Sequence, residues 1–197
     1  MRSATGVTLG RYRYTTLDIL IIAVIAAIGG VVSAYVVGAW AKFIEGAIGP
    51  FGAALNNPFF IFWGIVAVLL VPKPGVALIS SVLTGAVEVV AGSLDGSIVL
   101  VFVFLQGLGV EIGFLALGYA RSLPAAVLGG ALAGIGCAIS LTAVFGFTKL
   151  DPVVLVVFYA AMAVADGLIG GILAWVIAQG VGRAGIAGGR EGWQRVG

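Results

Sequence analysis

The sequence predicts an all-α integral membrane protein, a bundle of six transmembrane helices with a cap or re-entrant loop after the first helix. Three observations support this fold class: of the 197 residues 61% are hydrophobic, only 9% are charged, and the mean hydropathy is +1.22. A soluble domain has roughly a quarter of its residues charged, because its surface must face water. The scarcity of charge here indicates that lipid surrounds most of the chain.

Six apolar segments remain when the sequence is cut at charges, prolines and turn residues. A helix needs about 20 apolar residues to cross the hydrocarbon core of a bilayer. The second segment is short for a crossing and the last is long. The whole chain, 1–197, is expected to form a single transmembrane domain that ends in a short polar cytoplasmic tail at 182–197. The predicted spans are 17–39, 58–71, 75–91, 97–120, 123–147 and 152–181.

The segment between the first two spans, residues 40–57, is interrupted by Lys42, Glu45 and a Gly-Pro pair. It is too broken for a predicted spanning helix and too apolar for a solvated tail. A structured cap or re-entrant loop fits this composition. A plain interfacial linker fits it equally well, because Trp40 and Phe43 suit the boundary between membrane and water.

Lysine and arginine are divided unequally between the two ends of the six spans. Cytoplasmic loops are enriched in these residues. With the N-terminus inside, only Lys42 and Lys149 fall on the outer face, so both termini are expected in the cytoplasm. The residues that fall on the inner face are Arg2, Arg11, Arg13, Lys73, Arg121, Arg183, Arg190 and Arg195.

Several function classes are disfavoured by what the sequence lacks. It has no histidine and a single cysteine, Cys137, so no metal site, no cofactor and no Ser/His chemistry are predicted, and the protein is not expected to be an enzyme. Its ten basic residues are scattered, so nucleic-acid binding is not expected either. No G-x-x-x-x-G-K-[ST] motif occurs, so the chain lacks the phosphate loop that would let it hydrolyse ATP itself.

Acids inside the spans are the main candidates for function, because a carboxylate in hydrocarbon must face a cavity or a partner. Glu88 lies near the outer end of the third span, Glu111 in the fourth and Asp166 in the sixth. Each could bind a cationic or hydrogen-bond-donating ligand, line water, stay protonated, or serve as a structural strut or helix cap.

Three uncharged residues near the outer half of the bundle could complete a pocket: Asn57, Trp63 and Gln106. An aromatic face together with a carboxylate suits a flat, cationic ligand that carries an amine. The alternative roles are ordinary ones, since Trp63 could face lipid or the core and Asn57 precedes a proline at a helix start.

Two short signatures carry a resemblance to a known family. Residues 73–78 are K-P-G-V-A-L and residues 106–111 are Q-G-L-G-V-E, with V-E at 87–88 and A-G-S at 91–93 between them. The region of about 72–114 resembles the substrate-binding S components of energy-coupling-factor vitamin importers, most closely the YkoE type. Outside this region only the number of spans and the chain length agree.

The resemblance implies a six-helix subunit of the prokaryotic cytoplasmic membrane whose outward-facing pocket takes thiamin or its hydroxymethylpyrimidine precursor. The loop after the first helix would cap the pocket, and a separate transmembrane coupling protein and cytoplasmic ATPases would drive transport. The resemblance assigns the carboxylate of the site to Glu88, with Gln106 and Glu111 on the facing helix. It also places the contact with the coupling subunit at the small residues Ala23 and Ala27 of the first helix.

Three alternatives remain at the level of sequence. Other S components bind a different vitamin or a metal ion on a similar bundle, since a fold does not determine its ligand. An intramembrane enzyme could use Glu88, Glu111 and Asp166 as acid and base groups. The chain could also be a structural membrane subunit that binds no small molecule.

Overall fold

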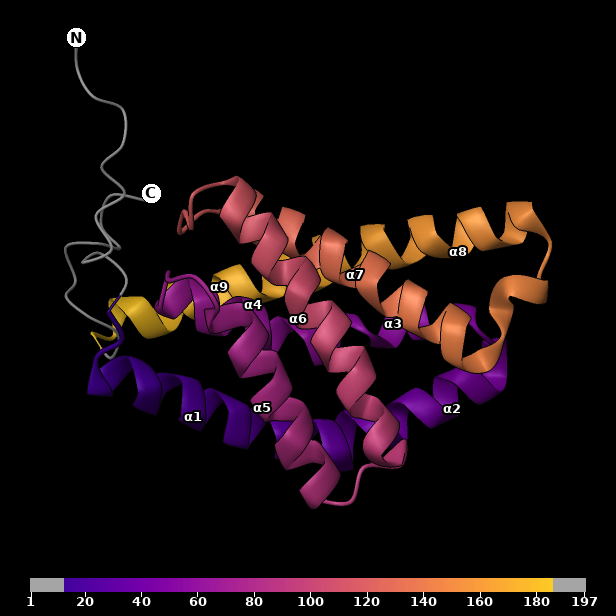
Figure 1. The fold of residues 1–197 in the computed structure, drawn as a ribbon, viewed down its shortest axis with the longest axis horizontal. Helices are drawn as coiled ribbons and strands as arrows, with labels where there is room; N and C mark the ends of the chain where they lie inside the picture. The colour runs from indigo at the N-terminus through magenta and orange to yellow at the C-terminus, as the bar shows by residue number, and fades with distance from the viewer. Residues whose placement is uncertain (1–12, 186–197) are drawn as a thin grey trace, which may run out of the picture.

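The computed structural model describes residues 13–185, and this part of the chain is entirely helical apart from its turns. The predicted all-α class is confirmed, and Figure 1 shows the helices packed into one elongated bundle. A sixth apolar helix has 15 residues, so six full-length crossings are not confirmed for the described residues. The helices that are long and apolar enough to cross a membrane are Thr16–Ile48, Phe51–Leu70, Gly96–Ala116, Leu123–Phe145 and Pro152–Arg183.

The first helical rod is longer than the sequence predicted. It runs without a break through α1 (Thr16–Val32), the π-helical turn η2 (Ser33–Val37) and α2 (Gly38–Ile48), a total of 33 residues. At 1.5 Å per residue this rod is about 50 Å long, which exceeds the thickness of a bilayer core. Its start is set by a capping box, in which Thr15 Oγ1 accepts from Asp18 N at 3.2 Å and Asp18 Oδ2 accepts from Thr15 N at 2.6 Å.

The structure does not confirm a cap or re-entrant loop at residues 40–57. Most of this segment belongs to α2 and to the short helix α3 (Phe51–Asn56), which leads into α4 (Pro58–Leu70). The chain turns only at Gly49, whose φ of +65° favours glycine, and at the proline that follows it. Lys42, Glu45 and Gly46 therefore do not interrupt α2, because the backbone groups of a helix are satisfied within the helix itself.

The other helices match the predicted spans more closely, with one early ending. The predicted span 97–120 stops at Ala116, because Gly118 and Tyr119 both have positive φ, +63° and +57°, and turn the chain. The remaining elements are α5 (Val76–Val90), η3 (Gly96–Ile98), α6 (Val99–Ala116), α7 (Leu123–Phe145), η4 (Phe147–Lys149), α8 (Pro152–Ala165), η5 (Asp166–Gly170) and α9 (Gly171–Arg183).

Helix α1 begins and α9 ends at the same end of the bundle, which we call the terminal end (Figure 1). The α2–α3 turn lies at the opposite end, near the turn that follows α7. Basic residues from four separate parts of the chain, Arg13, Lys73, Arg121 and Arg183, belong to segments at the terminal end. Arg2, Arg11, Arg190 and Arg195 lie outside the described residues.

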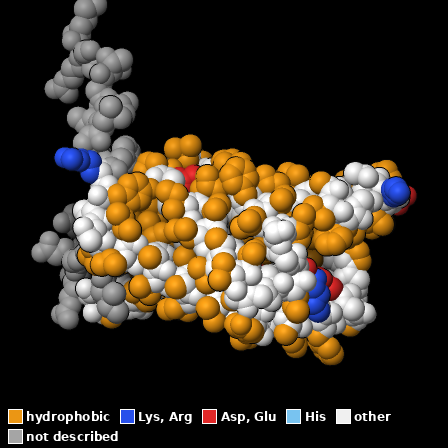
Figure 2. Space-filling view, turned by 60° about the horizontal axis from the view of Figure 1, so that its bottom comes forward, with side chains coloured by type: hydrophobic (Ala, Val, Ile, Leu, Met, Phe, Trp, Pro, Cys, Tyr) orange, Lys and Arg blue, Asp and Glu red, His pale blue; other side chains and the backbone are white. Residues whose placement is uncertain are grey.

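The surface that Figure 2 shows is mainly hydrophobic, with charged side chains toward the two ends of the long axis. Large apolar residues such as Val24, Ile28 and Phe104 are about half exposed on the helices, which suits a lipid environment. Inside the bundle, small residues bring backbones together: a Cβ added to Gly113 of α6 would lie 2.6 Å from Gly129 Cα of α7.

We expect Gly113→Ala to lower the stability of the detergent-solubilised protein by about 1–3 kcal/mol, because the added methyl group overpacks the α6–α7 contact. The matched control is Gly46→Ala in α2, where a Cβ would meet nothing within 4 Å. Replacing that glycine should be neutral or stabilising by up to about 1 kcal/mol. Thermal unfolding measures both, and equal melting temperatures for the two variants would contradict close α6–α7 packing.

Candidate functional site

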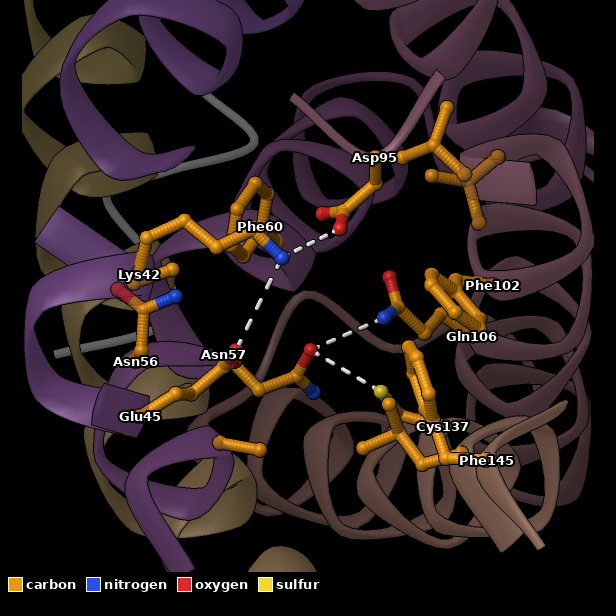
Figure 3. Close-up of a pocket in the computed structure, with 15 residues that line it drawn as sticks. Lys42, Glu45, Asn56, Asn57, Phe60, Asp95, Phe102, Gln106, Cys137 and Phe145 are labelled. Carbon is orange, nitrogen blue, oxygen red and sulfur yellow. Dashed lines mark hydrogen bonds and ion pairs between the residues drawn. The ribbon is translucent and has the colours of Figure 1, made fainter. Parts of the chain in front are cut away.

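A cavity of about 60 Å³ lies between α2, α3, the start of α4, α6 and α7, beside the turn before α6 (Figure 3). We call it the pocket. It combines charged side chains, carboxamides and phenyl rings, which is unusual in a chain with so few polar residues. It is lined by Ala41, Lys42, Glu45, Ala53, Asn56, Asn57, Phe60, Asp95, Val99, Phe102, Val103, Gln106, Cys137, Leu141 and Phe145.

The side-chain amide of Asn57 holds one wall of the pocket together. Asn57 precedes Pro58 at the start of α4, and it is 5% exposed. Its Nδ2 donates to Asp166 Oδ2 at 2.5 Å, and its Oδ1 accepts from Gln106 Nε2 at 2.9 Å and from Cys137 Sγ at 3.2 Å. One amide therefore connects α4, η5, α6 and α7, and both of its polar atoms are satisfied.

An ion pair crosses the pocket between α2 and the turn that precedes α6. Lys42 Nζ lies 2.5 Å from Asp95 Oδ1 and 3.9 Å from Glu45 Oε2. The side chains of Lys42, Asp95 and Glu45 are 44%, 25% and 36% exposed, so the pair is partly screened by its surroundings. With one cation and two carboxylates, the lining has an excess of negative charge, which attracts cations.

Aromatic rings and one unpartnered oxygen complete the lining. Phe60, Phe102 and Phe145 face the cavity, and the centroids of the Phe102 and Phe145 rings are 6.3 Å apart. Asn56 is buried, and its Oδ1 has no hydrogen-bond partner among the described residues. A buried acceptor of this kind costs stability unless a donor reaches it, so it is available to a ligand.

A larger void of about 400 Å³ adjoins the pocket at the α2–α3 turn and is lined by Gly49, Pro50 and Phe147 together with residues of the pocket. Ligand sites for small organic molecules usually measure about 300–1,000 Å³, so the pocket by itself is too small for one. The residues common to the two voids are Glu45, Ala53, Leu141 and Phe145. A shift of the side chains at this shared wall would join the two volumes.

Of the predicted site residues, Asn57 and Gln106 meet in the pocket, whereas Glu88 and Trp63 do not line it. Glu88 is buried and is connected to the pocket lining through Ser93. Glu88 Oε1 accepts from Ser93 Oγ at 3.0 Å, and Ser93 Oγ accepts from Asp95 N at 3.3 Å. Glu88 Oε2 has no partner among the described residues. Trp63 packs against Phe62, with ring centroids 4.1 Å apart.

Glu111 lies nearer the terminal end, away from the pocket. Its Oε1 accepts from Gly75 N at 2.5 Å and from Tyr119 Oη at 2.5 Å, and its Oε2 accepts from Ala77 N at 3.1 Å. The carboxylate therefore occupies the amino end of α5, where free backbone N–H groups favour an anion. The two sequence signatures meet here, because Gly75 and Ala77 belong to the first and Glu111 to the second.

Other contacts fasten the same region. Lys73 Nζ lies 2.5 Å from Asp18 Oδ2 and 2.9 Å from Arg13 O, and Tyr14 Oη donates to Pro74 O at 2.6 Å. Burial, and then the nearby carboxylates of Glu111 and Asp18, raise the pKa of the Tyr14 hydroxyl above its ordinary value. The hydroxyl therefore keeps its proton at neutral pH and remains a donor.

Sequence reasoning did not assign Lys42, Glu45, Asp95, Cys137 or Phe145 to the site. Lys42 and Glu45 offered a signal, because a lysine and a glutamate three residues apart in an apolar helix need a polar partner or a cavity. Asp95 lies two residues after Ser93 in a short turn and gave no such signal. Ala23 and Ala27, the predicted partner contact, are exposed on α1.

We expect Glu111→Gln to lower stability by about 1–3 kcal/mol, because the amide turns a donor toward one of the N–H or O–H groups that the carboxylate accepts from. Tyr119→Phe, which removes only one of these bonds, should cost about 1 kcal/mol. Thermal unfolding in detergent measures both changes. A melting temperature unchanged by Glu111→Gln would show that Glu111 does not anchor α5.

Residues 17–136 match a family described as the permease component of an ABC-type cobalt transport system. The chain is 30% identical over 145 residues to the putative HMP/thiamine permease protein YkoE of Bacillus subtilis, covering 72% of this chain and 73% of that protein. It also superposes on the crystal structure of an S component of an ECF transporter with a TM-score of 0.83, at 26% identity and covering 89% of both chains.

Proposed function

Because the chain belongs to the S components of energy-coupling-factor (ECF) transporters, we propose that it is the substrate-binding subunit of an importer for thiamin or its hydroxymethylpyrimidine precursor. YkoE, the relative from Bacillus subtilis, is described as an HMP/thiamine permease. The relatives are transport proteins, so we infer that this chain is a binding subunit and not an enzyme.

One observation supports the ligand class most strongly: two carboxylates, the unpaired acceptor Asn56 Oδ1 and phenyl rings surround the same pocket. Thiamin joins an aminopyrimidine, which donates hydrogen bonds, to a cationic thiazolium ring. Asp95 and Glu45 suit the cation, and the amides of Asn56 and Gln106 suit the amine. The phenyl rings of Phe60 and Phe102 suit flat cationic rings.

The pocket itself has room only for part of such a ligand, and the adjoining void supplies the rest. We propose that a ligand enters from the α2–α3 turn and displaces the shared wall at Leu141 and Phe145. In this proposal Glu88 does not touch the ligand but positions Asp95: its Oε1 accepts a hydrogen bond from Ser93 Oγ, which accepts one from the backbone N–H of Asp95. Trp63 and Glu111 contribute to packing and to the anchoring of α5 in this proposal.

A metal ion is the main alternative ligand, because the family model that matches is described by cobalt transport. Cobalt is usually bound by several nitrogen, sulfur or oxygen ligands. The chain has no histidine, and no three Cys, Asp or Glu residues gather within the described part of the chain. The donors that do line the pocket favour an organic cation.

We expect thiamin, at a hundredfold excess over its Kd, to stabilise the detergent-solubilised protein by about 2.7 kcal/mol, because it binds only the folded state. Hydroxymethylpyrimidine should also raise the melting temperature, whereas riboflavin, biotin and Co²⁺ should not. A shift with one of these three and none with either pyrimidine would overturn the ligand assignment and leave the family unchanged.

Two aspartate variants test whether the thiamin shift comes from the pocket: one changes the pocket lining and the other is its control. Asp95→Asn should lose most of the thiamin shift, since it removes a carboxylate from the pocket lining. Asp151→Asn should keep it, because Asp151 is an exposed residue that caps α8 through Val153 N. An undiminished shift in Asp95→Asn would remove that residue from the ligand site.

The coupling subunit is proposed to pack on α1 at Ala23 and Ala27, which are one turn apart and exposed. The energy for transport is proposed to come from separate ATPase subunits, as in the family, since this sequence has no phosphate loop of its own. Both termini are proposed to lie in the cytoplasm, on the side that holds most of the basic residues.

We expect Ala23→Leu and Ala27→Leu to abolish vitamin uptake in cells that carry the partner subunits, because added bulk prevents close approach of the two helices. Ligand affinity of the isolated variants should stay at the wild-type value, since neither residue lines the pocket. The control is Ala47→Leu, an exposed alanine on α2 of the same rod. Normal uptake by the double variant would contradict a coupling surface at this position.

A further inference from the structure

The charged side chains that line the pocket do not balance one another. Among the described residues of the lining, Lys42 supplies the one cation, whereas Asp95 and Glu45 each supply a carboxylate. The three side chains are between 25% and 44% exposed, and the ammonium lies 2.5 Å from Asp95 and 3.9 Å from Glu45. Contact with water and with an opposite charge favours the charged form of each group. The lining therefore has room for one more positive charge.

Lys42 is placed where it can exchange one carboxylate for the other. Its ammonium lies between the two, and the dashed lines of Figure 3 run from Lys42 Nζ to Asp95 and to Glu45. Glu45 is three residues further along α2, so the two side chains are neighbours on one face of the helix. The four-carbon stem of a lysine rotates easily. A swing toward Glu45 keeps the ammonium paired and frees Asp95.

Asp95 does not depend on Lys42 for its position, because its turn is fastened from the other side. The Asp95 N–H donates to Ser93 Oγ at 3.3 Å, and Ser93 Oγ donates to Glu88 Oε1 at 3.0 Å. The backbone of the same turn is closed by Ser93 N, which donates to Glu88 O at 3.0 Å, and by Gly96 N, which donates to Ser93 O at 3.0 Å. The freed carboxylate therefore stays in the pocket lining.

We propose that Lys42 is a specificity-determining residue: on binding, its ammonium moves from Asp95 to Glu45, and a ligand with one positive charge takes its place beside Asp95. This inference rests on the proposed function and specifies that the thiazolium ring of thiamin meets Asp95. Two positive charges then face two carboxylates. A neutral ring in the same position breaks the ion pair and leaves Asp95 without a cation, so the site selects against it.

The first experiment varies the charge of the ligand and keeps its shape. Calorimetry on the full-length protein compares thiamin with the isostere in which a neutral thiophene ring replaces the thiazolium. Wild type should bind thiamin on the order of 10- to 100-fold more tightly, the effect of one charged group that loses its partner. In Asp95→Asn this ratio should fall toward one. Equal affinities of the two isosteres for wild type would overturn the proposal, and this comparison does not depend on the folding of any variant.

The second experiment tests Lys42 itself. In Lys42→Met the ligand no longer displaces an ammonium, so the affinity for thiamin relative to that for uncharged hydroxymethylpyrimidine should rise on the order of 10-fold. The matched control is Lys149→Met, which removes an exposed lysine of η4 that lines neither the pocket nor the larger void. It should keep the wild-type ratio. If wild type binds both ligands and Lys42→Met leaves their ratio unchanged, this inference fails and the proposed function stands. Binding of neither ligand to wild type would reject the proposed function.

A double-mutant cycle separates the exchange from a direct contact between Glu45 and the ligand. Under the proposal Glu45 receives the displaced ammonium, so Glu45→Gln should weaken thiamin binding about 10-fold in wild type but less than about threefold in the Lys42→Met background. An equal loss in both backgrounds would show that Glu45 holds the ligand directly, and would contradict the exchange.

Discussion

The hydrogen bonds of the Asn57 side chain are the constraint on which the pocket depends. In a bundle surrounded by lipid, a polar group without a partner costs several kcal/mol, so a buried side-chain amide is most stable where other polar groups meet it. Asn57 satisfies this condition with Asp166, Gln106 and Cys137 at once. The same bonds fix where α4 begins relative to α6, α7 and η5, and therefore the shape of the wall that a ligand would meet.

The requirement that buried polar groups be paired explains what the sequence could and could not predict. Glu88, Glu111 and Asp166 are recognisable as significant because acids are rare inside apolar segments. Their partners are not recognisable: Asp166 is 109 residues from Asn57, and Glu111 is 36 residues from Gly75. The pattern shows that a carboxylate must be satisfied, but whether backbone amides, a side chain or a ligand does so depends on the packing of distant helices.

The same distinction applies to the fold. Length and hydropathy predicted an all-helical membrane protein and the positions of most helices, because these properties are local. They did not predict the helices at residues 40–57, where Lys42, Glu45 and the Gly-Pro pair suggested an interruption. Helix α2 continues past Lys42 because this side chain pairs with Asp95, 53 residues along the chain, and because within 40–57 only Gly49 has a positive φ. Composition alone therefore does not distinguish a loop from a helix whose charged face lines a cavity.

The two ends of the bundle are held by interactions of different strength, and this difference supports the proposed entry of a ligand at the α2–α3 turn. Near the terminal end, backbone groups are fastened directly: Glu111 accepts from two N–H groups of α5, and Arg121 donates to the Leu69 and Leu70 carbonyls at the end of α4. These bonds satisfy helix ends that would otherwise be unpaired, so breaking them is costly.

At the α2–α3 turn the comparable contact is the ion pair between Lys42 and Asp95, which is partly exposed. Pairs of this kind contribute only about 0–1 kcal/mol. The turn itself relies on Gly49 and Pro50, which border the larger void. In the proposed binding mode a cationic ligand replaces Lys42 as the partner of Asp95, so the ion pair that is broken when the pocket opens is re-formed with the ligand. The hydrogen bonds around Asn57, which shape the pocket wall, do not involve Lys42 or Asp95, so this proposed opening leaves them in place.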